Sequence, residues 1–501
     1  MSAQSTPAVL HITSAVGGGV DRYIRDIAAT TRRRHHVLHV GREVDVLEDV
    51  ATGSFFPLRF DAGIDASREA LEGWIRSTGI GIVHAHSLDR DCRLRLHTLV
   101  RERAIPYVVT LHDLTFVRPT AFEEERMPDP DWEWIATVAP TLERAAVVIT
   151  PSEFILDLVL ACVTGVRTVV IAPGIRAPSR SDALQPPATF AQGAPPHVVA
   201  VVGAVGAHKG SSVVQGVANK LGGSDIGIVV IGYTDTVRAQ GWVVPGNLYI
   251  HGPYLDNTIT DLLHAYRVET VLFPNRLPES FSYTLSEVWA AGIPVIVPGE
   301  GALGERVERH GGGWLLPPGF DDSEAAALLV WLTTAQGAEE HGRVKLQIAQ
   351  GDTLRIPPLE AMTREIEALY ERFAIPIAHA PNDESARAAL NSLFAANLNG
   401  FEFRKELLGL ATELAQSRAR SKKLEQDLDG MAKETAAWVA KLEQNTASWI
   451  AKLEGDIALL KQSIEKLEAE NRVLADQKAA FDRLPETMRK YLIKRAFRER
   501  G

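Results

Sequence analysis

The chain has 501 residues, 46% of them hydrophobic, so it is too long for one core and suited to two or three packed domains with extensions. A net charge of −10 argues against a nucleic-acid partner, and two cysteines, Cys92 and Cys162, exclude a disulfide framework. The amino terminus has no basic signal-like segment, and the apolar runs are short and interrupted. We therefore expect a cytoplasmic protein that does not span a membrane.

Apolar, strand-like runs alternate with helical segments through residues 1–172. A glycine turn at 17–19 and a helix over 21–30 follow the first of them. This alternation predicts a parallel sheet wound on both faces by helices. The expected strands are 9–13, 37–40, 81–84, 107–111 and 147–150.

A second series begins after a connector at 173–196 that contains six prolines and is therefore expected to be extended. We place a second domain of the same type at 197–375. Its last helix, 359–373, carries an apolar stripe and should pack onto one domain or bridge both. Ligands of such folds bind at the carboxyl ends of the strands, which predicts a site in the interdomain cleft. The expected strands are 197–202, 226–231, 248–251, 269–274, 295–297 and 314–316.

The most informative segment is PESFSYTLSEVWAAGIPVIV, residues 278–297, in which Glu279 and Glu287 are eight positions apart. It predicts a helix over 280–291 between two buried strands. The first turn of such a helix presents amides that suit a diphosphate, and the glutamates offer acceptors to hydroxyl groups. A sugar nucleotide has both groups. On spacing alone, two solvated glutamates on an amphipathic helix remain an equal alternative.

Further motifs occur in a fixed order: GGGVDRYI, VHAHS, VTLHD, VITPSEF and PGI in the first half, then VVGAVGAHKG, VVIG, YIHGPY and AAGIPVI. With the Glu279 to Glu287 segment, they make residues 8–373 resemble a GT-B glycosyltransferase, and in particular the retaining nucleotide-sugar enzymes of family 4. The resemblance implies an α/β fold of two Rossmann-like doubly wound domains facing across a cleft, with the first domain on the acceptor side. The second domain would bind the nucleotide sugar.

The resemblance also implies roles for residues of the second domain. Lys209 would lie against the donor diphosphate. Glu279, with the amides of Ser280, Phe281, Ser282 and Tyr283, would hold the hydroxyls of the donor sugar near the leaving group. Glu287 would accept hydrogen bonds from both ribose hydroxyls.

This chain departs from the family pattern at one position, where Ala204 replaces the usual arginine. Three consequences are open. Arg22, His208 or Arg306 supplies the missing charge, donor affinity is lower, or activity has been lost.

In the first domain, the resemblance places His112 against the donor sugar, and His112 would alternatively orient the acceptor hydroxyl with Asp113 fixing its tautomer. Gly18 and Gly19 would allow close backbone approach to a phosphate or acceptor, although a tight turn explains them equally well. His84 and His86 form an HxH pattern. We interpret that pair as a polar cleft edge rather than a zinc site, and predict neither a metal nor a cofactor.

No carboxylate is recognisably placed as a nucleophile, so retention predicts a front-side mechanism in which a leaving phosphate oxygen takes the acceptor proton. The expected activity is transfer of a sugar to a glycan or lipid-linked hydroxyl, as in bacterial surface polysaccharide or lipopolysaccharide biosynthesis. An alternative is a catalytically degenerate scaffold that organises a polysaccharide-assembly complex. A GT-B epimerase is a third, less favoured class.

Residues 376–400 are a predicted linker, and 401–484 show coiled-coil spacing that includes an eleven-residue repeat at 435–445 and 446–456. Asn471 at an a position favours a parallel dimer, and a helix folding back on its own chain is the alternative. The tail, 485–501, is a basic amphipathic segment. It suits an anionic surface on the inner face of the cytoplasmic membrane or an acidic partner, and a solubilising end is nearly as plausible.

Overall fold

The computed structural model describes residues 6–376, except 16, 42–44, 59–74, 76–77, 102–103, 122–125, 178–183, 256–257 and 351–355, and parts of 461–490. The chain divides into two compact units, Met1–Glu413 and Leu414–Gly501. The first unit contains two Rossmann-like domains, as the sequence predicts. None of the helices in the described part of the chain combines the length and apolar character needed to cross a bilayer.

The first domain is built on an eight-stranded sheet of order β4-β3-β2-β1-β5-β6-β7-β8. All neighbouring strands are parallel except the edge pairs β2–β3 and β3–β4, which are antiparallel. The strands are β1 (Ala8–Thr13), β2 (His35–His39), β3 (Asp45–Asp49), β4 (Ser54–Leu58), β5 (Ile80–Ala85), β6 (Tyr107–Thr110), β7 (Val147–Thr150) and β8 (Thr168–Val170). The helices are α1 (Gly18–Thr30), α3 (Arg90–Arg101), α4 (Trp132–Arg144) and α5 (Glu153–Cys162).

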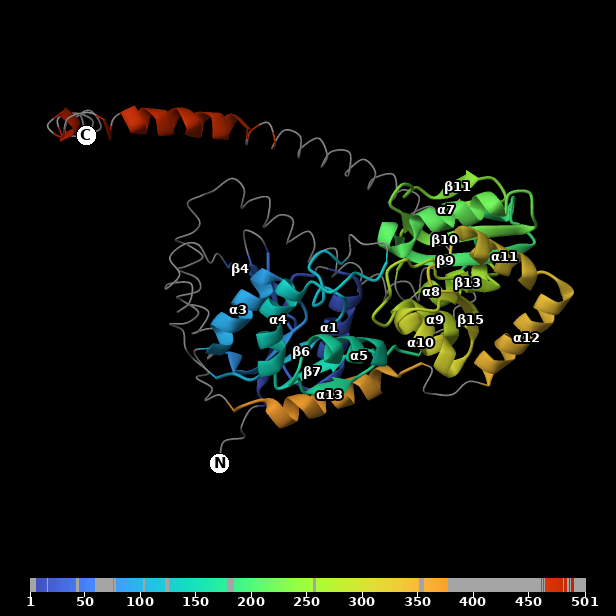
Figure 1. Cartoon of the computed structure of the whole chain (residues 1–501), viewed down its shortest axis with the longest axis horizontal. Coiled ribbons are helices and arrows are strands. Elements are labelled where there is room, and N and C mark those ends of the chain that lie inside the picture. The colour runs from blue at the N-terminus through green and yellow to red at the C-terminus, as the bar shows by residue number, and fades with distance from the viewer. Residues whose placement is uncertain are drawn as a thin grey trace. The chain divides into compact units, whose positions relative to one another are not determined.

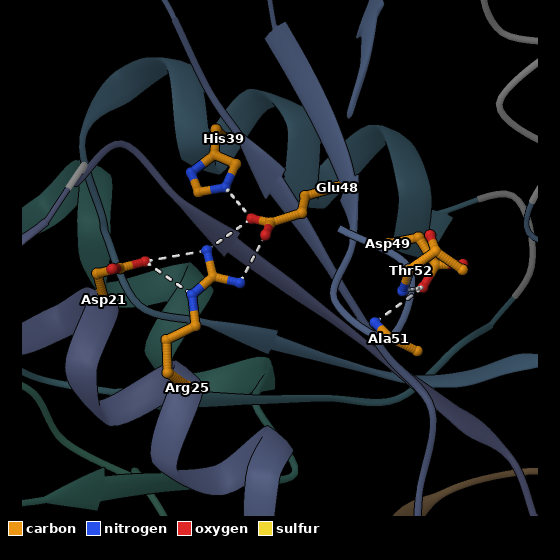
Figure 2. Close-up of polar contacts among 7 residues, drawn as sticks. All are labelled: Asp21, Arg25, His39, Glu48, Asp49, Ala51 and Thr52. Carbon is orange, nitrogen blue, oxygen red and sulfur yellow. Dashed lines mark hydrogen bonds and ion pairs between the residues drawn. The ribbon is translucent and has the colours of Figure 1, made fainter. Parts of the chain in front are cut away.

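The antiparallel edge formed by β3 and β4 was not predicted. Glu48 on β3 is buried, since Arg25 of α1 binds both of its carboxylate oxygens at 2.6 and 2.7 Å and His39 lies 2.9 Å away (Figure 2). Burial alone raises a carboxyl pKa, but the hydrogen bonds from His39 and Arg25 lower the pKa of Glu48 to about 2. This ion pair fixes α1 against the edge of the sheet.

The second domain has a seven-stranded sheet of order β11-β12-β10-β9-β13-β14-β15, with only β11 antiparallel to its neighbour. The strands are β9 (His197–Val205), β10 (Ile226–Thr234), β11 (Gly241–Val244), β12 (Leu248–Ile250), β13 (Thr270–Leu272), β14 (Val295–Pro298) and β15 (Gly313–Leu316). The helices are η2 (Ala207–Lys209), α7 (Ser211–Lys220), α8 (Ile259–Ala265), α9 (Tyr283–Ala290), α10 (Gly301–His310), α11 (Asp322–Leu332) and α12 (Ala335–Ala349).

The proline-rich connector is not extended throughout. It contains a short helix, α6 (Ala188–Ala191), because Phe190 is buried in the second core. The Phe190 ring stacks on Trp242 at 5.5 Å and meets Tyr266 edge-on at 4.7 Å. The end of the connector therefore belongs to the second domain.

Helix α13 (Leu359–Phe373) has the predicted bounds and packs onto the first domain rather than the second. Leu359, Met362, Ile366 and Tyr370 join a core cluster with residues of β1, β5, β6 and α1. Figure 1 shows α13 along the first domain, although the helices before it belong to the second. The chain thus crosses back, and Ile375 donates its backbone N–H to the Gly81 carbonyl.

Most of the carboxyl-terminal region lies outside the described residues. This holds for the predicted linker (376–400), most of the coiled coil (401–484) and most of the basic tail (485–501). Residues 465–480 are helical, and the side chains of Leu467, Val473 and Leu474 are exposed in the single chain. The coiled coil and its oligomeric state remain predictions.

Candidate functional site

The glycine turn and the start of α1 lie close to the start of α9. Gly17 and Gly18 have φ of 76° and 69°, a backbone conformation that residues with a side chain rarely adopt. A Cβ added to Gly19 would lie 3.7 Å from the ring of Tyr283, the first residue of α9. Two helix amino termini therefore meet across the domain boundary, and both present backbone N–H groups.

Helix α9 begins later than the predicted helix, at Tyr283 rather than Ser280. Ser282 has φ of 76°, and its side-chain oxygen caps the helix by accepting from the Leu285 backbone N–H. The Ser280 hydroxyl donates to the His112 carbonyl, while the Ser280 carbonyl accepts from the Ser152 hydroxyl at 2.8 Å. Residues 280–282 thus form a strained loop pinned to the first domain.

Arg306 holds this loop from within the second domain. It donates to the carbonyls of Phe281 and Ser282 and to the Ser286 hydroxyl, at 3.2, 3.0 and 2.7 Å. Burial lowers its pKa to about 9, and its guanidinium lies 4.2 Å from the Phe281 ring centroid. These contacts engage Arg306 within the protein, so of the three candidates to replace the charge missing at Ala204, it is poorly suited.

Lys209 and Glu279 are brought together although seventy residues separate them. Lys209 ends the short helix η2 after β9, and Glu279 follows β13, the neighbouring strand. The Lys209 Nζ lies 3.8 Å from Glu279 Oε1, which also accepts from the Asn275 side-chain amide at 2.9 Å. Lys209 is 43% exposed, so its charge remains accessible.

Glu287 is paired with a residue of the first domain. Arg22, on α1, donates to Glu287 Oε1 at 2.6 Å, and its guanidinium lies 4.4 Å from the Tyr283 ring centroid. Arg22, which follows the glycine turn, thus places its positive charge against α9, the helix that contains Glu287. Arg22 is therefore also engaged within the protein, as Arg306 is, and which residue substitutes for the arginine missing at Ala204 stays a prediction.

His112 and Asp113 follow β6 and have different contacts. His112 Nε2 lies 2.9 Å from His86 Nδ1, and burial lowers the pKa of His112 to about 3. Asp113 Oδ1 instead accepts from the Thr115 backbone N–H at 2.8 Å and from its hydroxyl. The residue hydrogen-bonded to the His112 ring in the described contacts is therefore His86 and not Asp113.

His84 and His86 do not lie at the edge of a cleft, so their interpretation as a polar cleft edge is wrong. Both side chains are buried, at 0% and 4% exposure, because α1 and α13 cover this face of the sheet. Two further histidines lie with them, His11 on β1 and His35 on β2. Sequence reasoning missed these two; His11 is a polar residue inside an apolar strand, and His35 lies just before the predicted strand 37–40.

The sequence contains three Asp-x-Asp patterns, and two of them, at 89–91 and 129–131, lie at helix starts. Asp89 accepts from the backbone N–H groups of Asp91 and Cys92, before α3, and Asp131 caps α4 by accepting from the Trp134 N–H. Such caps account for these residues. The third pattern, at 427–429, lies outside the described residues.

A cavity of about 740 Å³ lies beside the predicted donor site. Glu279 is on its wall, whereas Lys209, Glu287 and His112 are not among its lining residues. The cavity lies at the carboxyl ends of β13, β14 and β15, with two residues contributed by the first domain. It is lined by Arg126, Met127, Asn275, Arg276, Leu277, Pro278, Glu279, Pro298, Gly299, Glu300, Leu303, Pro317, Pro318, Gly319 and Phe320.

Comparison with solved structures gives the fold. The chain is similar to sucrose-phosphate synthase from Thermosynechococcus elongatus (18% identity, TM-score 0.54, covering 73% of this chain and 98% of that one). It is also similar to Anabaena HepE in complex with UDP-glucose (17%, 0.55, 73% and 99%) and to a glycosyltransferase from Rickettsia africae (15%, 0.51, 74% and 99%). No curated protein matches the chain in sequence.

Two Rossmann-like domains with strand ends facing one site, and the likeness to these structures, define a protein of the GT-B fold. Residues 17–177, nearly the whole first domain, match the model of Glycosyltransferase Family 4. The first domain is therefore similar to that family of retaining, nucleotide-sugar-dependent glycosyltransferases, and the match covers less than half of the chain.

Proposed function

We propose that the cleft between the two domains binds a nucleoside diphosphate sugar and transfers its sugar, with retention, to a hydroxyl of a glycan or lipid-linked acceptor. The observation that carries this proposal is the meeting of Lys209, Glu279 and the amino terminus of α9 at the carboxyl ends of neighbouring strands. A diphosphate needs a cation and oriented amides, and a sugar needs acceptors, so this group of residues suits both.

In this proposal, Lys209 and the first-turn amides of α9 stabilise the charge that develops on the leaving diphosphate. Glu279 and the backbone of residues 280–282 hold the donor sugar. Glu287 takes the ribose hydroxyls, which requires its contact with Arg22 to be shared or exchanged when the donor binds. The proposed step is front-side, with the acceptor proton passing to a leaving phosphate oxygen.

The donor is best sought first among uridine diphosphate sugars, because Anabaena HepE, which shares the fold, was crystallised with UDP-glucose. We further propose that the acceptor belongs to bacterial surface polysaccharide or lipopolysaccharide assembly. The support is the carboxyl-terminal sequence, whose coil at 401–484 suits a dimer and whose basic segment at 485–501 suits an anionic membrane surface.

Calorimetric titration with UDP, GDP, ADP and their sugars tests the donor site. Lys209→Ala and Glu287→Gln should each weaken binding of the preferred nucleotide about 10- to 100-fold, the effect of losing a charge-assisted hydrogen bond. Lys220→Ala is the matched control, because Lys220 is 42% exposed and also lies in an ion pair, with Asp322. Its affinity should equal that of the wild type.

Unchanged affinity in both site variants would remove the proposed site. A wild-type protein that binds a nucleotide sugar but transfers and hydrolyses nothing would favour the alternative, a degenerate transferase acting as a scaffold. The alanine at position 204 gives that alternative its support.

A further inference from the structure

A line of hydrogen-bonded imidazoles runs through the first domain and ends at His112. Thr31 Oγ1 lies 2.6 Å from His35 Nε2, and His35 Nδ1 lies 2.9 Å from His11 Nε2. His11 Nδ1 then lies 2.8 Å from His86 Nε2, and His86 Nδ1 lies 2.9 Å from His112 Nε2. Each joint between rings thus pairs the Nδ1 of one with the Nε2 of the next, in the same sense throughout.

The sheet explains why these residues meet. Strands β2, β1, β5 and β6 are parallel neighbours, and alternate residues of each strand point to the same face. Tyr23 of α1 covers the line, with its ring 4.9 Å from that of His112 and 5.8 Å from that of His86. Water is therefore kept from the middle of the line, and His11, His35 and His86 are all less than 5% exposed.

Each ring in the line carries one proton. Burial is the main reason that the pKa of His35 and of His112 is about 3 and that those of His11 and His86 lie well below the ordinary value. A neutral imidazole has one N–H and one bare nitrogen. Since every joint needs one of each, all four rings must have the same tautomer, and only two arrangements of the whole line are possible.

Thr31 selects between these two arrangements. Its hydroxyl lies 2.9 Å from the Ile27 carbonyl, which also accepts from the Thr31 backbone N–H, and we assign the single hydroxyl proton to that carbonyl because a carbonyl can only accept. The short contact with His35 must then be a donation from His35 Nε2–H to Thr31. Following the line, each Nε2 is protonated and each Nδ1 is bare. The last bare nitrogen is Nδ1 of His112.

We propose that Thr31, His35, His11 and His86 are positioning residues that hold His112 in its Nε2–H tautomer, so that its Nδ1 accepts a hydrogen bond from a sugar hydroxyl in the cleft. This rests on the proposed function. His112 is the partly exposed end of the line, and its carbonyl binds Ser280, the residue after Glu279. Within the described residues, no hydrogen bond to His112 Nδ1 is seen.

A metal site is the competing use of the same cluster, because ligand atoms of His11, His84 and His86 lie within 4.8 Å of one another. Hydrogen bonds already account for both nitrogens of each ring. His84 contacts the Tyr370 hydroxyl at 2.6 Å and the Thr110 hydroxyl at 2.7 Å, and the other two rings belong to the line. A bound metal would have to displace these bonds and break the line.

Nitrogen-15 NMR of the histidine-labelled wild-type protein tests the tautomer directly, because protonated and bare ring nitrogens have well separated shifts. At pH 7.5, the His112 signals, assigned by comparison with His112→Gln, should show a protonated Nε2 and a bare Nδ1. The reverse pattern, or one equivalent of tightly held zinc in the purified protein, would overturn the proposal. This measurement needs no activity, so it stands apart from any failure of the proposed function.

Kinetics then test whether the line acts through His112. His86→Leu should lower kcat on the order of tenfold or more while the donor KM stays within about twofold, and His86→Asn should recover most of the loss because its side-chain oxygen accepts from His112 Nε2–H. Thr31→Val should mix the His112 tautomers and lower kcat. Thr30→Val is the matched control, since the Thr30 hydroxyl bonds only local carbonyls at the end of α1.

Equal kcat in His86→Leu and His86→Asn, or an unmixed His112 tautomer in Thr31→Val, would overturn the positioning role. Donor hydrolysis without an acceptor distinguishes the two sources of the hydroxyl. A loss in both hydrolysis and transfer assigns the hydroxyl to the donor sugar, and a loss in transfer alone assigns it to the acceptor. Nucleotide affinity and thermal melting confirm that each variant is folded.

Discussion

The buried histidines should make the first domain sensitive to mild acid. Besides His97, which is nearer the surface, six described histidines there have pKa values lowered chiefly by burial: His11, His35, His36, His84, His86 and His112. Where values are given, they are about 3 for His35 and His112 and about 4 for His36. In the unfolded chain the same groups titrate near about 6.5. Between these limits the unfolded state binds more protons than the folded state.

The sign and size follow from this difference. The neutral buried histidines leave the free energy of unfolding undiminished well above pH 6.5. That free energy falls as the pH drops from 6.5 toward the folded-state pKa values. At pH 5.5, one unit below the unfolded pKa, each group lowers the free energy of unfolding by about 1.4 kcal/mol, and six together lower it by roughly 8 kcal/mol. Since domains are stable by about 5–15 kcal/mol, the first domain should approach unfolding near pH 5 to 5.5.

Hydrogen exchange followed by mass spectrometry is the suitable assay, because a two-domain chain need not unfold in one step. Peptides of β1, β5 and β6 should lose protection between pH 7.5 and 5.5, after correction for the intrinsic exchange rate. Peptides of β9 and β10 should lose much less and serve as an internal comparison. Urea titrations over the same range give the proton uptake on unfolding.

A single variant sharpens the test. His36 is 1% exposed and lies outside the imidazole line, so His36→Leu should reduce the proton uptake by about one and the acid loss by about 1.4 kcal/mol. Proton uptake below about two at pH 5.5 in the wild type, or equal acid loss in both domains, would refute the reasoning.

Three further predictions concern the proposed donor site and the carboxyl-terminal region. Glu279→Ala should lower turnover while a nucleoside diphosphate still binds in calorimetry, because the proposed contacts of Glu279 are to the sugar; wild-type rates would mean that another carboxylate has this role. Deleting residues 401–501 should give a monomer that retains donor binding, and light scattering that finds the full-length chain already monomeric would discard the coiled coil. Full-length protein should co-sediment with anionic vesicles and dissociate near 0.5 M salt, where the Debye length is roughly 4–5 Å. Co-sedimentation unchanged by glutamate at four basic positions would reject membrane attachment: Arg489, Lys490, Lys494 and Arg495.

Much of the fold follows from the sequence alone. Buried parallel strands need continuous apolar runs, and helices that cover them need an apolar stripe, so both domains and the bounds of α13 are predictable. The segment from Glu279 to Glu287 likewise has a local pattern, a strand end followed by a helix start. Its exact beginning at Tyr283 is not local, because contacts from Ser152, His112 and Arg306 hold residues 280–282 out of the helix.

Other features depend on partners that are distant in sequence. Glu48 can be buried in a strand only because Arg25 and His39 form hydrogen bonds with its carboxylate. The apolar stripe of α13 predicts a packed helix but does not identify the domain on which the helix packs. Arg22 and Glu287 meet across 265 positions.

The imidazole line is the clearest case, because its rings come from four separate segments of the first domain. Sequence supplies histidines within or directly after strand-like runs, with nothing to show that they meet. Only the parallel register brings them within hydrogen-bonding distance, since neighbouring strands lie about 4.8 Å apart and alternate side chains share a face. A site formed by residues of one strand and the turn after it can therefore be predicted from sequence. A site formed by side chains of several strands depends on the order of those strands in the sheet, which only the tertiary structure gives.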